Sequence, residues 1–551
     1  VDRALRQMAA VRRHVGHDRA LSLDEAIHVA QGLSRRDFLK LGGIAASGLM
    51  LAGCDLASGD DPSPTGQAVA SGSGADTPRV VIVGAGLAGM TAAYRLHQAG
   101  LPTQVFEARD RVGGRCWSAR DFAGGQVGEH GGEFVDTRHV HLRVLADELG
   151  LELDDLWAPW DADTISLNYV DGALVSPGRL FHEMAPAVDE IVRLARQGPI
   201  FAGEAPAAIR ALDEQTEAEW YAEHVGATDT ALYRMWSQRQ SGWYGLDPDA
   251  LSAVNLIDFY AIDYPGGDER YTIRGGNDQV PGRILDALPE GTVTLEAPLE
   301  AMIARDDATT ELRFAGQEPV IADRVILTLP FTTLRDVDLT DAGLPNDRMR
   351  AIEDLGMGTN AKVLMQFDRP FFTGFGGWGG SLNRGDDPIL GTWESGATDT
   401  NEPELGLLTV YTGGAVGAGY GADEPHAPAS AEVVDVTLAA IEDAEPSVRE
   451  AFTGTAWLDS WVQDPWIHGS YTAFLPGQTT AWWGTLGRPI GTVHFAGEHT
   501  SVYSQGFLNG GVESGDRAAG EVIAALGRDV PPGLARTRRM QRRYEPVFPW
   551  A

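Results

Sequence analysis

The sequence predicts an α/β protein in which a Rossmann-like domain is interleaved with an α+β domain. Two observations lead to this prediction. A β-branched run at Val80–Val83 passes through a glycine-rich turn into a stretch with helical spacing, which is typical of a βαβ unit. Further strand-like and helical segments then follow one another to the end of the chain, as expected where helices cover a sheet.

Length, charge and cysteine content exclude several classes of protein. A chain of 551 residues can form two or three domains with sizeable cores, and 43% hydrophobic with 22% charged residues is ordinary for a globular protein. The net charge of −35 argues against a nucleic-acid partner and favours solubility. Two cysteines, Cys54 and Cys116, cannot build a disulfide framework, and His139 and His141 lack partners at metal-ligand spacing.

The first 54 residues have the features of a targeting segment. Arg35 and Arg36 precede an apolar run over 41–53 that ends at Cys54, which resembles a twin-arginine signal joined to a lipoprotein box. The run is too short for the ~20 residues that span a bilayer, so a permanent transmembrane anchor is the weaker alternative. We expect export by the twin-arginine route to the periplasm or another extracytoplasmic site, as a cell-envelope lipoprotein tethered by a lipid on Cys54. Residues 55–78, rich in Ser, Gly, Asp and Pro, are expected to form a flexible linker.

The turn after the first strand contains the pattern G-x-G-x-x-G. Gly84 permits the tight turn, Gly86 lets the backbone approach a pyrophosphate, and Gly89 allows close packing of helix against strand. The helix that follows offers N–H groups to phosphate oxygens. The second strand, PTQVFEA, ends in Glu107 about 20 residues further on, where a carboxylate can bind ribose hydroxyls. Together these features predict an adenine dinucleotide site.

The stretch EARDRVGGRCWS, which begins at Glu107, resembles the signature of the flavin-dependent amine oxidases, the family of monoamine, polyamine and L-amino-acid oxidases. Three further segments resemble that family in the same order: GEHGGEFVD (128–136), RYTIRGGNDQVPGRIL (270–285) and 493–523. The resemblance covers nearly everything from Arg79 to about Gly527 and implies FAD as the cofactor. The FAD-contacting residues that motif and resemblance together predict are Gly84, Gly86, Gly89, Glu107, Ala108, Arg109, Gly114, Arg115, Gly131, Gly132, Glu133, Phe134, Leu299, Trp461, Gly497, Glu498, Gly506, Phe507 and Leu508.

The same resemblance implies the catalytic residues. Lys362 opens an apolar strand, and at the matching motif of amine oxidases a lysine holds a water beside flavin N5; a lysine that reaches solvent is the alternative. Trp461 matches a tryptophan packed near the flavin. Tyr471 and Phe507 match the two aromatic walls beside the substrate nitrogen, where π faces stabilise positive charge.

The sequence also departs from the family pattern. Ser470 stands where monoamine oxidases carry the flavin-linking cysteine, and Cys116 lies too early for that role, so FAD is expected to be noncovalent. Where some L-amino-acid oxidases bind the substrate carboxylate with an arginine, this chain has Glu133 and Phe134, so that Arg115 or an arginine of the helical cap would have to serve. Glu133 could prefer a second cationic group, as in di- or polyamines, or be an ordinary hydrogen-bonded glutamate; we favour the latter.

The domains are expected to be discontinuous. The resemblance implies a Rossmann-like FAD-binding domain built from three segments, and a substrate domain with a mixed sheet and a helical cap built from two. The predicted ranges are 79–150, 269–330 and 453–528 for the FAD-binding domain, 151–268 and 331–452 for the substrate domain, and 529–551 for a basic C-terminal tail that stays solvated.

The resemblance implies an FAD-dependent oxidase. Its substrate would be a primary or secondary amine or an L-amino acid, which loses hydride to flavin N5 to give an imine; water then yields a carbonyl product, and O2 is reduced to H2O2. Two alternatives stay open: a related flavin dehydrogenase or desaturase that uses an apolar substrate or a redox-protein acceptor, and a flavin-binding surface lipoprotein without activity. A homodimer is compatible with the sequence. A flavin held by separate chain segments also explains export after folding in the cytoplasm.

Overall fold

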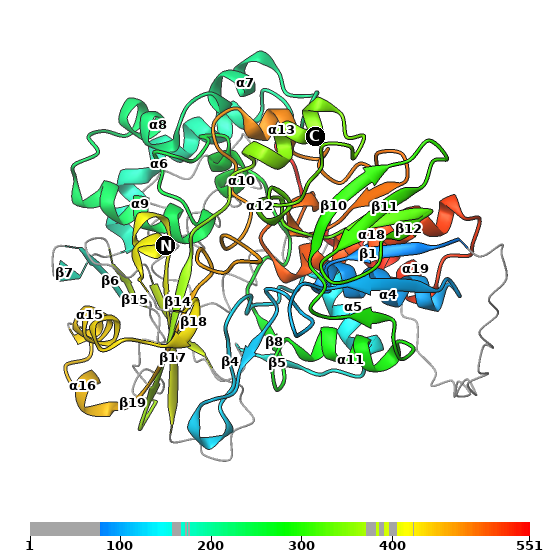
Figure 1. The fold of residues 1–551 in the computed structure, drawn as a ribbon. Helices are drawn as coiled ribbons and strands as arrows, with labels where there is room; N and C mark the ends of the chain where they lie inside the picture. The colour runs from blue at the N-terminus through cyan, green and yellow to red at the C-terminus, as the bar shows by residue number, and fades with distance from the viewer. Residues whose placement is uncertain are drawn as a thin grey trace, which may run out of the picture.

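The computed structural model places two bodies side by side, with the chain passing between them several times (Figure 1). The predicted signal region 1–54 and the linker up to residue 77 lie outside the described part of the chain. The described residues are 78–156, 167–170, 173–174, 177–370, 382–384, 391–395, 405–421, 424–442 and 444–550.

The first body is built on a five-stranded sheet with the strand order β20-β13-β1-β2-β9. All neighbouring strands are parallel, and the β-branched residues of β1 put it at the buried centre. The strands come from all three segments expected to form the FAD-binding domain. They are β1 (Val80–Val83), β2 (Thr103–Phe106), β9 (Val293–Thr294), β13 (Arg324–Leu327) and β20 (Val493–Phe495).

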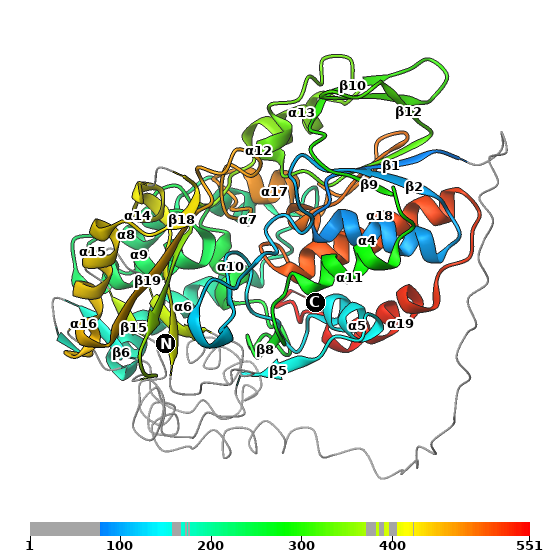
Figure 2. The same ribbon diagram turned by 60° about the horizontal axis from the view of Figure 1, so that its bottom comes forward.

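Layers cover both faces of this parallel sheet. Val80 and Ile82 of β1 pack against helices α4, α11 and α18, which run together along one face in Figure 2. Val81 and Val83 point to the opposite face, where an antiparallel sheet of β10, β11 and β12 packs. The bounds are α4 (Leu87–Gln98), α11 (Gln279–Ala287), α18 (Leu508–Ala525), β10 (Leu299–Ala304), β11 (Thr310–Phe314) and β12 (Val320–Ala322).

The second body contains an eight-stranded sheet with the order β18-β19-β14-β17-β16-β15-β6-β7. The sheet is mixed, because β15 pairs with β6 in parallel while β14 pairs antiparallel with β17 and β19. Helix α15 (Ala431–Glu442) packs on one face. The strands are β6 (Leu167–Val170), β7 (Ala173–Leu174), β14 (Ala361–Phe367), β15 (Leu382–Arg384), β16 (Gly391–Ser395), β17 (Gly406–Thr412), β18 (His426–Pro428) and β19 (Phe452–Ser460).

One segment boundary differs from the expectation. The range 453–528 was predicted to belong wholly to the FAD-binding domain, but β19 pairs with β14 from Ala361↔Ser460 to Phe367↔Phe452. These residues therefore complete the large sheet, and the chain returns to the first body only after Ser460. Strand spacing alone could not reveal this, since a strand can pair with either sheet.

Helices form a cap beside the large sheet, as predicted, and the predicted fold class is confirmed. Helix α8 begins with a capping box in which Thr216 and Glu219 satisfy each other's backbone N–H groups. Within the described residues, no helix combines the length and apolar character that crossing a membrane requires. The cap helices are α6 (Pro177–Ala195), α7 (Ala207–Asp213), α8 (Glu217–His224), α9 (Ala231–Tyr244) and α10 (Asn255–Tyr260).

The C-terminal segment is docked, contrary to the expectation of a solvated tail. Helix α19 (Pro532–Gln541) packs on α5 (Val140–Glu148) and buries Leu534. Beyond it, Val547 pairs with Asp263 through both backbone hydrogen bonds. The arginines of this tail made a solvated end the simplest expectation, but they belong to a helix whose other face buries Leu534 and Thr537.

Short elements complete the chain. They are β3 (Ser118–Ala119), β4 (Gly128–Glu129), β5 (Leu153–Asp155), β8 (Tyr271–Ile273), α12 (Phe331–Leu334), α13 (Asn346–Asp354), α14 (Gly414–Gly419), α16 (Val448–Ala451), α17 (Gln478–Trp482), η1 (Ala123–Gly125), η2 (Glu498–Thr500) and η3 (Arg542–Tyr544).

Candidate active site

A cavity of about 1420 Å³ is lined by residues of both bodies. Pockets for single small ligands usually measure about 300–1,000 Å³, so this one has room for a dinucleotide together with a substrate. Most predicted site residues meet here. Those that line it are Gly84, Gly86, Glu107, Ala108, Arg109, Gly114, Arg115, Gly131, Gly132, Glu133, Phe134, Lys362, Trp461, Tyr471, Gly497, Glu498, Gly506, Phe507 and Leu508.

Two helix N-termini open onto the cavity. Helix α4 begins after Gly86 and α18 after Phe507, and neither has a side-chain cap or an acidic residue in its first turn. The first N–H groups of each helix therefore have no side-chain acceptor and carry the positive end of the helix dipole. Leu87 and Leu508, the first residues of the two helices, line the cavity. This arrangement suits the phosphates of a dinucleotide.

The turn between β1 and α4 requires glycine at two positions. Gly84 has φ +97°, and a Cβ there would lie 2.5 Å from Oγ1 of Thr328. Gly89 does not line the cavity, but a Cβ there would lie 1.9 Å from the carbonyl oxygen of Gly84. The helix can therefore lie against the turn only because this residue has no side chain, which is the packing role predicted for Gly89.

Glu107 is held rigidly at the end of β2. Its Oε2 accepts a hydrogen bond of 2.6 Å from the N–H of Ala85, and its Oε1 accepts one of 3.0 Å from the N–H of Arg109. A carboxylate has about four acceptor positions, so capacity remains for ribose hydroxyls on the cavity side.

Leu299, by contrast, does not line the cavity. It begins β10 and is buried in the core beneath the parallel sheet. The residues that run beside the Glu107 segment are Glu296, which donates to the carbonyl of Arg109, and Ala297, which donates to the carbonyl of Glu107. The FAD contact predicted for Leu299 is therefore not seen in the lining of the cavity, because the chain has already entered β10 at this residue.

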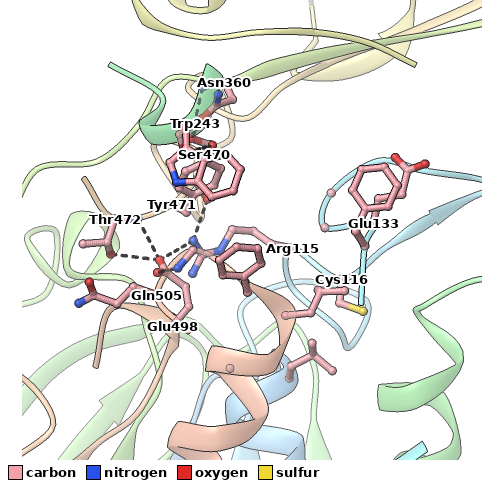
Figure 3. Close-up of a pocket in the computed structure, with 18 of the residues that line it drawn as sticks. Arg115, Cys116, Glu133, Trp243, Asn360, Ser470, Tyr471, Thr472, Glu498 and Gln505 are labelled. Atoms are coloured by element: carbon pink, nitrogen blue, oxygen red, sulfur yellow. Dashed lines mark hydrogen bonds and ion pairs between the residues drawn. The ribbon is translucent and has the colours of Figure 1, made fainter. Parts of the chain in front are cut away.

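Arg115 and Glu498 form an ion pair that fixes three segments around the cavity (Figure 3). Arg115 Nη1 lies 3.0 Å from Glu498 Oε1 and donates to the carbonyl of Ser470 at 2.7 Å. The Glu498 carboxylate also accepts from the N–H groups of Thr472 and Gly506. Burial raises the pKa of Glu498, but Arg115 and these hydrogen bonds outweigh it, and the net pKa is lowered. Arg115 is thus committed to the scaffold, which disfavours it as the anchor of a substrate carboxylate.

Lys362 lies at the start of β14 with its side chain 6% exposed, which excludes a lysine that reaches solvent. Its Nζ donates to the carbonyls of Glu129 at 3.0 Å and Gly131 at 2.8 Å and to Oε2 of Glu133 at 2.9 Å. An ammonium has three N–H groups, so these three acceptors use all of them. The chain has only two lysines, Lys40 and Lys362, among 43 basic residues.

Glu133 is the carboxylate partner of this lysine. Its second oxygen, Oε1, accepts a 2.7 Å hydrogen bond from the hydroxyl of Ser395 on β16. Glu133 is therefore a buried glutamate with a partner on each oxygen, which is the interpretation we favoured over a site for a second cationic group of the substrate.

Aromatic rings line the cavity that also contains Lys362 and Glu133. The hydroxyl of Tyr471 lies 3.0 Å from that of Tyr411 and 2.9 Å from the carbonyl of Gly242. Burial raises the pKa of both phenols, which keeps both rings neutral near pH 7. Phe507 contacts Trp243 edge-on with the ring centroids 6.4 Å apart. Tyr471 and Phe507 thus both face the cavity that Lys362 lines.

Trp461 and Phe134 also have defined neighbours. The indole N–H of Trp461 donates to the carbonyl of His130 at 3.0 Å. The ring of Phe134 lies 5.3 Å from that of Trp393, and Trp393 lies 5.2 Å from Tyr411.

Several lining residues were missed at the level of sequence. Tyr411, Trp243 and Trp393 lie on β17, α9 and β16, and these segments carry no motif that could have revealed them. Arg138 also lines the cavity, with its guanidinium 4.5 Å from the ring centre of Tyr264 and 5.4 Å from that of Phe507. Glu269 lines the same cavity, and its backbone is in the left-handed region with φ +47°.

The two side chains relevant to a covalent flavin link are unreactive. Ser470 Oγ donates to Oδ1 of Asn360 at 2.6 Å (Figure 3). The thiol of Cys116 is buried, and burial raises its pKa well above the ordinary value, so it stays protonated. No group of three or more metal-ligand side chains occurs within the described ranges.

Several known proteins are similar to this chain in sequence or in fold. A family model described as flavin-containing amine oxidoreductase matches residues 87–523. An L-amino acid dehydrogenase of Synechocystis sp. is 25% identical over 81% of this chain and 95% of its own length, and the flavin-containing amine oxidase B of Bos taurus is 25% identical over 82% and 86%. The structure of cyclohexylamine oxidase from Brevibacterium oxydans matches with a TM-score of 0.70 at 25% identity, covering 82% of this chain and all of that one. A putrescine oxidase bound to putrescine has the same fold, with a TM-score of 0.69 at 24% identity over 81% and 99%.

Proposed function

The chain belongs to the flavin-containing amine oxidoreductases, and we propose that it oxidises a primary or secondary amine or an L-amino acid to an imine, with O2 as the electron acceptor. FAD is its cofactor, and the two helix N-termini, Glu107 and the lining around Gly131 fit it. The observation that carries the proposal is the aromatic pair Tyr471 and Phe507 beside the buried Lys362.

The residues around the substrate position orient it and remove water. FAD, when bound, supplies the hydride acceptor for the carbon next to nitrogen and passes two electrons to O2, which becomes H2O2. The neutral rings of Tyr471 and Phe507 offer π faces to an amine whose nitrogen gains positive charge as the hydride leaves. Their apolar setting favours the neutral amine, because desolvation disfavours an ammonium ion. Water then converts the released imine to a carbonyl compound and ammonia or a smaller amine.

A panel of monoamines, diamines and L-amino acids tests this proposal. The purified FAD-loaded protein should produce peroxide with at least one class, and the same compound should bleach the flavin absorbance in the absence of O2. Protein that is fully loaded with FAD and is bleached by none of these compounds would contradict the proposal and favour a flavin-binding lipoprotein without activity.

A second candidate is a dehydrogenase of the same substrates. One of the similar proteins is named L-amino acid dehydrogenase, which favours an acceptor other than O2. The two are distinguished by reoxidation of the substrate-reduced flavin: an oxidase recovers its colour rapidly in air, whereas a dehydrogenase does so only when a quinone or dye is added.

We expect FAD to be held without a covalent bond. Ser470 is hydrogen-bonded to Asn360, and the Cys116 thiol is protonated, so neither attacks the flavin ring. Precipitation of the protein with acid should leave all of the yellow colour in the supernatant, as measured by flavin absorbance. Colour that stays with the washed precipitate would show a covalent link.

We also propose that the protein is exported after folding, by the twin-arginine route, and is tethered by a lipid on Cys54. The FAD cavity supports this, because its lining runs from Gly84 to Gly511 and can form only in a folded chain. Exchange of Arg35 and Arg36 for lysine should leave active, FAD-loaded protein inside the cell, as measured by fractionation. Activity that still reaches the envelope would contradict the route.

A further inference from the structure

A continuous chain of buried charged side chains runs beside the FAD cavity. Nη2 of Arg109 donates to Oδ1 of Asp464 at 2.6 Å, and Oδ2 of Asp464 lies 2.9 Å from Nε2 of His426. The other nitrogen of His426, Nδ1, lies 2.8 Å from Oδ1 of Asp459, which in turn lies 3.0 Å from Nδ1 of His130. The exposed fractions of these side chains run from 0% to 12%, so water contributes little to their pairing. We call these five residues the His426 relay.

The relay connects distant parts of the fold. Arg109 follows Glu107 at the end of β2, and His130 directly precedes Gly131; both line the cavity. His426 and Asp459 lie in paired positions on β18 and β19 of the large sheet. His426 itself does not line the cavity, but it is the residue through which the two cavity-lining ends are joined.

We propose that His426 is a positioning residue for FAD: as an imidazolium it bridges Asp459 and Asp464 and so holds the Arg109 and His130 segments in the geometry that binds the cofactor. This inference concerns the FAD site alone and does not depend on which substrate is oxidised.

The hydrogen-bond geometry of the relay requires a cation at His426, because both of its ring nitrogens face carboxylate oxygens. Asp459 and Asp464 carry two negative charges and Arg109 carries one positive charge, so at least one of the two histidines must be charged to make the group neutral. A neutral imidazole has a single N–H and could donate to only one of the two carboxylates. The other carboxylate would then face a ring-nitrogen lone pair in a buried setting, which is costly.

Aromatic rings keep this site dry. Trp461 contacts the His426 ring edge-on with the centroids 4.5 Å apart, and Trp117 does so at 5.3 Å. Trp117 also contacts His130 with the ring centroids 3.9 Å apart and the planes tilted by 32°, and the Arg111 guanidinium lies 4.3 Å from the ring centre of Trp117. Low local polarity strengthens each ion pair of the relay and raises the cost of breaking one.

The titratable groups around His426 fix the sign of its pH dependence. Asp459 and Asp464 face it directly, Arg109 and His130 lie beyond them, and the Arg111 side chain is separated from it by Trp117. Burial alone would lower the pKa of His426, but the two carboxylates outweigh burial and raise it; the pKa of Asp464 is lowered to about 2. FAD retention should therefore be complete below the raised pKa of His426 and fall as the pH rises through it.

The test measures FAD release from the holoenzyme by the fluorescence of free flavin, between about pH 6 and about pH 9.5. Wild-type protein should bind FAD more weakly, by about tenfold or more, at the alkaline end. His426→Gln should bind FAD about tenfold or more weakly already at neutral pH, with a flattened pH dependence, because the amide has no charge to lose. His468→Gln is the matched control: the side chain of this histidine is 41% exposed, and its ion-pair partner among the described residues is the exposed Asp336, so FAD affinity should not change.

Two results would overturn the proposal. One is a wild-type dissociation constant for FAD that stays constant across this pH range, which needs no variant. The other is a folded His426→Gln protein that binds FAD within twofold of wild type with the wild-type pH profile. If His426→Gln does not fold, Asp464→Asn serves instead, because it breaks the link between His426 and Arg109. This variant should also bind FAD about tenfold or more weakly. A folded Asp464→Asn protein with wild-type affinity for FAD would overturn the proposal.

Discussion

Replacement of Lys362 by methionine is expected to lower the free energy of unfolding by about 3–5 kcal/mol, one of the two largest effects predicted for this protein. The substitution preserves much of the apolar stem but leaves the Glu133 carboxylate without its cation. The carbonyls of Glu129 and Gly131 lose their donor as well. Oε2 of Glu133 and the two carbonyl oxygens then lose their donor in a largely buried setting, although Oε1 of Glu133 keeps its bond from Ser395. Denaturant unfolding of the apoprotein measures the loss.

A second variant separates the charge from the packing. In Lys362→Met combined with Glu133→Gln the buried site carries no charge, so most of the lost stability should return. Glu133→Gln alone leaves the ammonium with two carbonyls and should cost less than Lys362→Met alone. Equal stability of Lys362→Met and wild type would contradict the ion pair at 2.9 Å.

The same variants test the catalytic role of Lys362. If it acts at the flavin, the double variant should fold and stay yellow, yet turn over at least ~10²-fold more slowly than wild type. Lys362→Arg is the informative conservative change: a planar guanidinium keeps the charge but does not match three acceptors arranged around a compact ammonium. This explains why an arginine-rich chain carries a lysine here. Full activity in the double variant would show that Lys362 only supports the fold.

The parts of the site that the sequence predicted are those built by local geometry. Gly84, Gly86, Gly89 and Glu107 fall within one βαβ unit made of β1, α4 and β2, where spacing determines position. Lys362 and its partner Glu133 are 229 residues apart, and no pattern in either segment reveals that they meet.

The errors have a common physical cause. Leu299 and the β19 boundary were placed by resemblance to the family, but which sheet a strand joins depends on its pairing with distant strands of this chain. The C-terminal tail was expected to stay in solvent because of its arginines, whereas α19 packs on α5 and buries Leu534 and Thr537. The sequence did not reveal the His426 relay for the same reason, since its members come from four separate stretches of chain.

Gly89→Ala is the other change expected to have a large effect. The added Cβ would lie 1.9 Å from the carbonyl oxygen of Gly84 and 3.0 Å from its carbon, and neither backbone atom can move without shifting the turn. We expect a loss of about 3 kcal/mol or more, within the range of severe overpacking. Gly282→Ala is the control, because it lies in helix α11 with no atom within 4 Å of the added Cβ, and should stabilise by about 0.5–1 kcal/mol.

The FAD content of the Gly89→Ala protein should fall further than its lower stability alone would explain. The contact at Gly89 sets the distance between α4 and the turn at Gly84, so a displaced helix moves its N-terminal N–H groups away from the phosphates. Even under conditions where Gly89→Ala is folded, as judged by circular dichroism, its FAD content per chain should be far below that of Gly282→Ala. A folded Gly89→Ala protein with full FAD content would mean that the turn can relax without changing the phosphate site, and the close approach would then have no role in cofactor binding.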